Sequence, residues 1–226
     1  MQGKVLVVTG VLGALGKVVA DIAQSRGALI AGIDHAPSQL AATPERIEIG
    51  GVDLSDAAQA TTAIDAAAKH FGRLDALINI AGGFAFEIVG DGDITTWQRM
   101  YALNVLTALN TSRAALPHLA ASRAGRIVNI GAMGALQAGS GMGPYAASKA
   151  GVHRLTEALA SEWKGKLTVN AVLPSIIDTK ANRADMPKAD FSKWVTPQEL
   201  AEVILFLASD AASGITGALI PVGGRV

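Results

Sequence analysis

The sequence predicts an α/β fold: a doubly wound parallel sheet of about seven strands with helices on both faces. Short apolar runs alternate with segments of helical periodicity along the chain, which is typical of parallel strands joined by helices. The first apolar run leads directly into a glycine-rich turn, and half of the 226 residues are apolar, which is ample for a sizeable core. We therefore expect a single domain that spans residues 1–226.

The expected strands are short apolar runs, and the expected helices have apolar residues at helical spacing. The run at 4–9 is apolar and β-branched, which suits a strand buried on both faces. Strands are expected at 4–9, 28–33, 46–49, 75–80, 126–130, 167–172 and 217–222, and helices near 14–26, 55–70, 95–120, 143–163 and 197–208. The irregular polar segment 180–196, interrupted by Pro187, suits either a mobile flap over a ligand crevice or a plain surface excursion.

A glycine turn joins the first strand to the first helix. Gly10 allows a tight turn, the small residues Gly13 and Ala14 let the backbone approach a pyrophosphate, and Gly16 permits close helix packing. Amides at the helix N-terminus would bind the anion. The turn, which also includes Leu15, is therefore either a dinucleotide site or an ordinary βα turn whose glycines serve steric needs.

Asp34 ends the second strand, eighteen residues after Gly16. A carboxylate there can accept hydrogen bonds from the 2′ and 3′ hydroxyls of an adenosine ribose, and it would repel a 2′-phosphate. Asp34 therefore favours the dinucleotide interpretation of the glycine turn. It predicts NAD as the cofactor, with NADH preferred over NADPH.

Other candidate residues also follow the ends of expected strands. Asp53 follows the third strand, Asn79 ends the fourth, Ala132 follows the fifth and Pro174 follows the sixth. The ligand crevice of a doubly wound sheet lies at the carboxyl ends of its strands. We therefore expect these residues to converge with the glycine turn on one rim.

Tyr145 and Lys149 lie four residues apart at the start of the helix expected over 143–163, so they share a helix face. A free tyrosine has a pKa of about 10 and is a poor acid-base catalyst at neutral pH. A nearby cation favours the phenolate and lowers that pKa, which would make Tyr145 a usable proton donor and acceptor. The same spacing also occurs on ordinary helices, so the rest of the chain decides between the two interpretations.

Composition excludes several other classes of function. Nineteen basic residues balance nineteen acidic ones, so no overall charge attracts nucleic acid or an anionic membrane. The lack of cysteine excludes disulfides and thiolate chemistry. The histidines, at 35, 70, 118 and 153, lack metal-ligand spacing, so we expect surface or helix-end roles and no metal. With no basic leader and no apolar run near the roughly 20 residues of a membrane span, we expect a cytoplasmic protein.

Together these features resemble the short-chain dehydrogenase/reductase family, over nearly the whole chain from Val5 to Gly224. The residues that carry the resemblance are Thr9, Gly10, Gly16, Asp53, Leu54, Asn79 to Gly82, Asn104, Tyr145, Lys149, Pro174 to Thr179 and Ile215 to Gly217. The resemblance implies an NAD(P)-binding Rossmann-fold domain. It also implies an oxidoreductase that transfers hydride from nicotinamide to a small-molecule substrate.

The resemblance further implies catalytic roles. Tyr145 would donate the proton, while Lys149 would lower the pKa of Tyr145 and bind the nicotinamide ribose. Asn104 would hold a proton-relay water. It falls at helical spacing with Tyr101 and Ala108, so it should point inward, with a structural buried amide as the alternative.

Cofactor contacts follow from the same resemblance. Asp53 would meet the adenine amino group with Leu54 beside it, or else Asp53 caps the next helix. Asn79, Ala81 and Gly82 would form the wall beneath the adenosine ribose, and the segment from Pro174, with Ile177 and Thr179, would clamp the carboxamide.

The chain departs from the family at Ala132, where a serine usually polarises the substrate carbonyl. Removing such a donor commonly costs about 10²–10³ in rate, which argues against an efficient ordinary ketone reductase. Ser140, from the same loop, could donate instead. The dihydropteridine reductases of the family are similar to this chain in lacking that serine and in an aromatic residue at Phe84, and their quinonoid substrate tolerates the loss.

A dihydropteridine-reductase-like activity is therefore the first hypothesis. A small-carbonyl or oxoacyl reductase is the second, and a dinucleotide-sensing protein without turnover is an alternative of another class. The helices near 95–120 and 143–163 carry more apolar surface than one buried face needs. They predict a homodimer or a dimer of dimers.

Overall fold

A computed structural model describes residues 1–226 and contains one seven-stranded sheet. The strand order is β3-β2-β1-β4-β5-β6-β7, and every neighbouring pair is parallel. The strands are β1 (Val5–Thr9), β2 (Leu29–Ile33), β3 (Arg46–Ile49), β4 (Ala76–Asn79), β5 (Gly125–Ile130), β6 (Leu167–Pro174) and β7 (Leu219–Val222). The predicted doubly wound parallel sheet is confirmed, with each strand close to its expected bounds.

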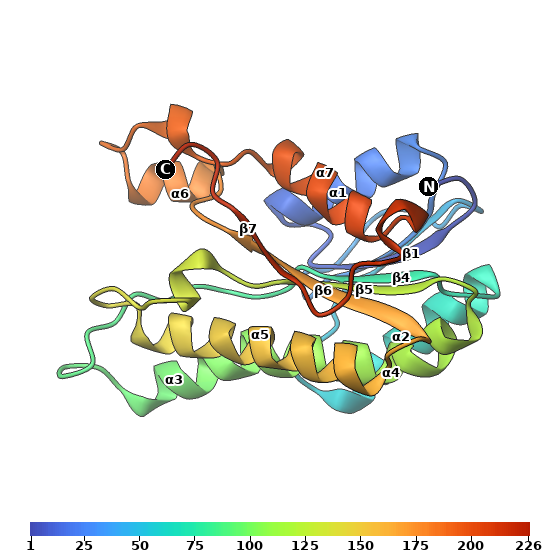
Figure 1. Ribbon diagram of the computed structural model, residues 1–226, viewed down its shortest axis with the longest axis horizontal. Helices are drawn as coiled ribbons and strands as arrows, with labels where there is room; N and C mark the ends of the chain where they lie inside the picture. Colours follow the sequence, from blue (N-terminus) through green and yellow to red (C-terminus); the bar gives the residue numbers. More distant parts are fainter.

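Helices cover both faces of the sheet (Figure 1). Two of them pack together on one face, namely α1 (Ala14–Ser25) and α7 (Pro197–Leu207). The opposite face is covered by α2 (Ala57–Phe71), α4 (Thr107–Ala121) and α5 (Gly143–Glu162), and α3 (Ile94–Tyr101) precedes α4. None of these helices combines the length and the apolar character needed to cross a membrane.

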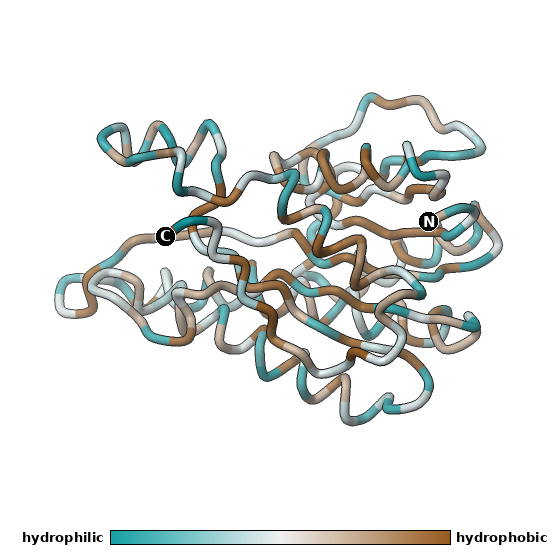
Figure 2. Tube along the Cα trace, turned by 45° about the horizontal axis from the view of Figure 1, so that its top comes forward, coloured by the Kyte–Doolittle hydropathy of each residue, from teal (hydrophilic) through white to brown (hydrophobic).

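The first strand shows why the strands are continuously apolar. All five residues of β1 are buried, and successive side chains of a strand point to opposite faces. Leu6 and Val8 therefore join the core beneath α1 and α7, whereas Val5 and Val7 join the core beneath α2 and α4. Figure 2 shows the same layering, with hydrophobic strands inside and hydrophilic residues on the outer turns.

The helix expected over 95–120 is interrupted. α3 leads directly into a five-residue π-helical turn, Ala102–Leu106, which continues as α4. A π turn shifts the helical register at that point, and such turns are frequent at functional sites. Asn104 lies at the centre of this turn.

The segment 180–196 is more ordered than its polar composition predicts. It contains α6 (Lys180–Asp185) and a short 3₁₀ turn, Phe191–Lys193. The side chain of Thr179 caps α6 by accepting a hydrogen bond from the backbone of Asn182. The far end of the segment is buried at Trp194 and Val195. The expectation of a wholly irregular segment is therefore wrong, because a local cap and a buried apolar anchor give it structure.

Candidate active site

The glycine turn after β1 brings the backbone close to the first helix. Gly10 has a φ of +67°, a conformation that side chains disfavour. A Cβ at Gly16 would lie 2.1 Å from the Gly10 carbonyl oxygen, so only glycine allows this close packing. No side chain caps α1 at Gly13, and its first turn holds no acidic residue. The helix N-terminus is thus free to bind an anion.

The turn forms one wall of a cleft of about 710 Å³ at the carboxyl edge of the sheet. The cleft is lined by residues that follow β1, β2, β3 and β4, together with residues of the helix after β4. They are Gly10, Leu12, Gly13, Ala14, Leu15, Gly16, Asp34, His35, Ala36, Val52, Asp53, Leu54, Ser55, Ile80, Ala81, Gly82, Arg99, Ala102, Leu103 and Thr107. The ends of β1, β2, β3 and β4 meet at this cleft as expected, whereas Ala132 after β5 and Pro174 at the end of β6 do not line it.

Asp34 lies at the rim of the cleft, beside the glycine turn. Its carboxylate accepts hydrogen bonds from the backbone N–H groups of Leu12, at 2.9 Å, and Ala36, at 3.0 Å. These bonds orient the side chain towards the turn. A dinucleotide fits this arrangement, since the cleft offers free helix amides for a pyrophosphate and a carboxylate for ribose hydroxyls.

Asp53 also lines the cleft, and it does not cap α2. Its Oδ1 accepts hydrogen bonds from the Ser55 N–H at 2.9 Å and the Ser55 hydroxyl at 2.6 Å, and these bonds lower the pKa of Asp53. The cap of α2 is Asp56. Asn110, which the sequence analysis missed, donates to the Leu54 and Ser55 carbonyls at 3.1 and 2.9 Å and so fixes this loop.

Asn79 does not line the cleft, contrary to the expectation that its side chain forms a wall of it. The side chain is 4% exposed, and its Nδ2 donates to Ser112 Oγ at 3.1 Å and to Asn129 Oδ1 at 2.8 Å. Asn79 ends β4 with its side chain directed into the buried layer below α4. The wall therefore consists of the residues that follow, Ala81 and Gly82 among them.

Asn104 points inward, as predicted, and is 1% exposed. Its Oδ1 accepts from the Gly83 N–H, and its Nδ2 donates to the Gly83 carbonyl, both at 3.0 Å. Nδ2 also donates to Ser148 Oγ at 2.9 Å. Both amide N–H groups are thus used to join the loop after β4 to α5.

Tyr145 and Lys149 lie on the first turns of α5, as expected. Lys149 is 7% exposed, and its Nζ donates to the Ile130 carbonyl at 2.8 Å. Burial lowers the pKa of Lys149 to about 8 and raises the pKa of Tyr145 to about 12. The expectation that the lysine lowers the tyrosine pKa is wrong for this structure, because desolvation of the phenol dominates.

The loop after β4 brings an aromatic ring to Tyr145, and the loop after β5 carries the other two predicted substrate residues. The ring of Phe84 meets the ring of Tyr145 edge to face, with centroids 5.0 Å apart. Ala132 is 4% exposed, and its backbone N–H donates to Nε2 of His153 at 3.3 Å. Ser140 is exposed in the outer part of its loop. The structure thus brings Phe84 to the tyrosine and leaves Ser140 at the surface.

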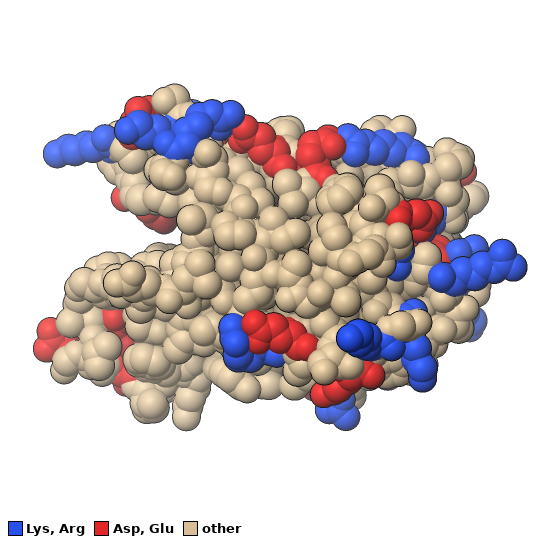
Figure 3. Space-filling view, viewed as in Figure 1, with Lys and Arg blue, Asp and Glu red and all other residues tan.

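The residues after β6 form a separate border of the site. Pro174 ends β6, Ile177 pairs with Val195, and Thr179 caps α6. None of these three predicted cofactor contacts lines the cleft beside the glycine turn. Figure 3 shows the molecule hollowed between the lobe around α6, which carries lysines and arginines, and an opposing lobe that is mostly uncharged with a few acidic side chains towards its end.

His153 lies in the core, with 2% of its surface exposed, and not at the surface or a helix end as expected. Its spacing in the sequence could have predicted this location, because His153 follows Lys149 by one helical turn and Tyr145 by two and so shares their helix face.

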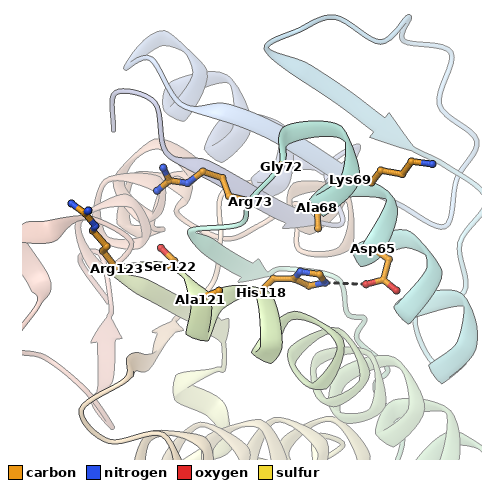
Figure 4. A pocket seen from close by; sticks show the side chains of 9 residues that line it. All are labelled: Asp65, Ala68, Lys69, Gly72, Arg73, His118, Ala121, Ser122 and Arg123. Atoms are coloured by element: carbon orange, nitrogen blue, oxygen red, sulfur yellow. Dashed lines mark hydrogen bonds and ion pairs between the residues drawn. The ribbon is translucent and has the colours of Figure 1, made fainter.

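A larger hollow, of about 1040 Å³, lies between the C-terminal ends of α2 and α4 (Figure 4). These helices end where β4 and β5 begin, so the hollow is at the amino edge of the sheet, away from Tyr145. His118 contacts Asp65 at 2.9 Å, while Lys69 and Arg123 extend away in different directions. Basic groups at helix C-termini are ordinary partners of the terminal carbonyls.

Comparison with known proteins agrees with this geometry. Residues 4–190 match the family model described as short chain dehydrogenase. The chain belongs to the short-chain dehydrogenase family. It is therefore an oxidoreductase that depends on a nicotinamide dinucleotide, as predicted. No cluster of three or more His, Asp or Glu side chains that could hold a metal ion is present.

Relatives of similar length match nearly the whole chain, beyond the residues of the family model. The chain is 29% identical to the 3-oxoacyl-[acyl-carrier-protein] reductase of Thermotoga maritima, over 99% of this chain and 98% of the relative. It is 31% identical to the D-threitol dehydrogenase of Mycolicibacterium smegmatis, over 99% and 93%. Its structure resembles carveol dehydrogenase from Mycobacterium avium in complex with NAD, with a TM-score of 0.87, 28% identity and coverage of 99% and 97%.

Proposed function

We propose that this short-chain dehydrogenase is an NADH-preferring reductase of a small substrate, with Tyr145 as the proton donor. The observation that carries the proposal is a cleft lined by the glycine turn, Asp34 and Gly82, with Lys149 directly behind Gly82: a Cβ at Gly82 would lie 3.5 Å from Lys149 Nζ. The hydride comes from the nicotinamide cofactor when it is bound. The residues of the chain supply binding, orientation and the proton.

Cofactor binding is assigned to the cleft beside the glycine turn. The uncapped N-terminus of α1 would hold the pyrophosphate, and the Asp34 carboxylate would accept hydrogen bonds from the adenosine ribose hydroxyls. Asp53 and Leu54 border the adenine end of the cleft. The negative charge of Asp34 disfavours a 2′-phosphate, which supports NADH over NADPH.

Proton transfer is assigned to Tyr145. With a pKa of about 12 the phenol is fully protonated at neutral pH, so it acts as a donor when the substrate accepts hydride. The phenolate that remains needs a nearby positive charge, and Lys149 is one helical turn away. Asn104 keeps α5 and the loop at Gly83 in register through its three hydrogen bonds.

Ala132 narrows the substrate class. No hydroxyl stands at this position, so a developing oxyanion lacks a donor that is commonly worth about 10²–10³ in rate. A quinonoid dihydropteridine or a similar activated ring needs that donor less, and the Phe84 ring beside Tyr145 suits a flat substrate. A small-carbonyl or oxoacyl reductase is the second candidate, favoured by the similarity to a 3-oxoacyl-[acyl-carrier-protein] reductase.

The substrate experiment compares wild type with Ala132→Ser. Steady-state NADH oxidation is measured with quinonoid dihydropterin and with a panel of ketones, quinones and oxoacyl thioesters, and Tyr145→Phe is the inactive control. We expect pterin turnover that the serine leaves unchanged or lowers. A large gain on a ketone, with no pterin turnover in either form, would indicate a degraded carbonyl reductase. NADH binding without turnover of any compound would indicate a dinucleotide sensor.

We also propose a homodimer or homotetramer. α4 and α5 cover the same face of the sheet. Alanine and leucine are frequent along both helices, which suits helix packing across a two-fold axis.

A further inference from the structure

The imidazole of His153 is buried at the exit of β5, directly behind the position of the missing serine. Its Nε2 lies 3.3 Å from the backbone nitrogen of Ala132. An amide N–H can only donate, so Nε2 must accept, and the ring is neutral with its proton on Nδ1.

The adjacent residue is adapted to this ring. A Cβ added at Gly131 would lie 2.5 Å from His153 Nε2 and 3.1 Å from Leu173 Cδ1. The φ of Gly131 is not positive, so steric room rather than backbone strain explains the glycine. Gly131 and His153 therefore form a complementary pair.

His153 and Lys149 hold the same short stretch of backbone from one face of α5. Lys149 Nζ donates to the Ile130 carbonyl at 2.8 Å, and His153 accepts from Ala132 two residues later. Between them the Gly131 N–H donates to the Val172 carbonyl at 2.9 Å. The exit of β5 is thus fixed at three consecutive residues.

We propose that neutral His153 is a positioning residue for the reaction, which holds the exit of β5 so that the Lys149 ammonium stays bound to the Ile130 carbonyl, one helical turn from Tyr145. This inference rests on the proposed role of Tyr145 and Lys149. The bond leaves the Ala132 N–H occupied, so that neither a hydroxyl nor this amide is offered to the substrate.

The charge state of His153 matters for the contact. Burial, with the positive charges of Arg154 and Lys149, lowers the pKa of His153. At the exit of β5 the ring lies against Gly131 and Ala132, neither of which is charged. A protonated ring would point an N–H at the Ala132 N–H and would place a second cation near Lys149, so protonation breaks the contact.

The first test compares His153→Leu with His153→Gln. A glutamine oxygen can accept from Ala132 where Nε2 does, whereas leucine cannot. We expect His153→Leu to lower kcat by about tenfold to a hundredfold, since small misplacements of catalytic groups cost this much. The KM for NADH should change little, and His153→Gln should restore most of kcat. His70→Leu, at the exposed end of α2, is the matched control.

The acid limb of the pH profile is a second readout. In wild type, kcat should fall at low pH as His153 becomes protonated, and this fall should be absent from His153→Gln. Equal kcat values for the leucine and wild-type proteins, or an unchanged acid limb in His153→Gln, would overturn the inference while leaving the proposed function intact.

A double-mutant cycle on Gly131 and His153 tests their contact without a measurement of turnover. Gly131→Ala should lower the melting temperature in wild type, because its Cβ meets the imidazole, and should do so much less in a His153→Ala background. Equal losses in both backgrounds would contradict the contact and the inference with it. If the coupling is found but wild type turns over no substrate, the proposed function fails and the positioning role fails with it.

Discussion

Tyr145 and Lys149 differ from free tyrosine and lysine because both are largely removed from water. Burial favours the uncharged form of each group, so the pKa of the phenol rises to about 12 while that of the ammonium falls to about 8. The phenol therefore holds its proton firmly, and the lysine is poised close to neutral pH. Tyr145 can therefore release its proton only if a cation stabilises the phenolate, so its function depends on the charged form of Lys149.

Replacement of Tyr145 by Phe should abolish turnover and leave NADH binding close to wild type, because only the donor hydroxyl is lost. The loss should be strongly non-additive with Lys149→Met, since both residues serve one proton transfer. Steady-state rates and nicotinamide fluorescence titrations measure the two effects. A Tyr145→Phe protein that keeps most of its activity would refute the assignment.

Activity and stability should change in opposite directions as the pH is raised above neutral. Activity should fall as pH rises through about 8, because Lys149 then loses its charge. Stability should rise between about pH 8 and 10.5, since in that window the unfolded lysine binds more protons than the folded one. Urea unfolding and initial rates at the same pH values check both signs, and Lys149→Met should lack that rise in stability.

Asp34 should set cofactor choice. In Asp34→Ala the carboxylate that repels a 2′-phosphate is gone, so the affinity gap between NADH and NADPH should narrow. Part of the loss in NADH affinity will come from a looser glycine turn, since Leu12 and Ala36 lose their acceptor. Fluorescence titration with both cofactors is the measurement, and equal or reversed affinities in wild type would contradict the proposed preference.

At the scale of elements, the site depends on how α5 is held against its neighbours. The π-helical turn places Asn104 where one amide joins Gly83 to Ser148 on α5, and Lys149 joins α5 to the end of β5. These bonds lie between segments distant in sequence. They link the loop that borders the cleft to the helix that carries the tyrosine.

Asn104→Ala should weaken both the fold and the site. Loss of a buried amide that satisfies Gly83 and Ser148 should lower the free energy of unfolding by about 1–3 kcal/mol. Activity should fall more than this loss of folded protein explains, because α5 and the loop lose their link. Gln98→Ala, which removes an exposed amide on α3, is a control of the same chemistry. Activity unchanged in fully folded Asn104→Ala would refute this linking role.

At the scale of the whole molecule, the sheet directs its binding residues to one edge and leaves helices α4 and α5 together on one face. Figure 1 shows both helices running along the side of the sheet opposite α1 and α7. The cleft therefore shares only Thr107, the first residue of α4, with the helices of the proposed subunit contact. Association through α4 and α5 would support α5 from its outer side.

Light scattering at micromolar concentration should give the mass of a dimer or tetramer. The physical reason is the apolar content of α4 and α5, which a second copy would cover. Paired charged substitutions on exposed positions of α5, such as Ala147→Glu, should shift the mass towards the monomer. The same change at Ser192, in the α6 segment, should not. A monomeric wild type would rule out the proposal.

The sequence by itself determined the succession of strands and helices along the chain, the glycine turn and the Tyr145–Lys149 pair. Each of these is a local pattern, since periodicity and short spacing are written in neighbouring residues. Only the tertiary structure decided the burial of His153, the turn of Asn79 away from the cleft and the bond from Lys149 to Ile130. Those features depend on residues far apart in the chain, and desolvation, which sets the two catalytic pKa values, is a property of the packed neighbourhood rather than of any spacing.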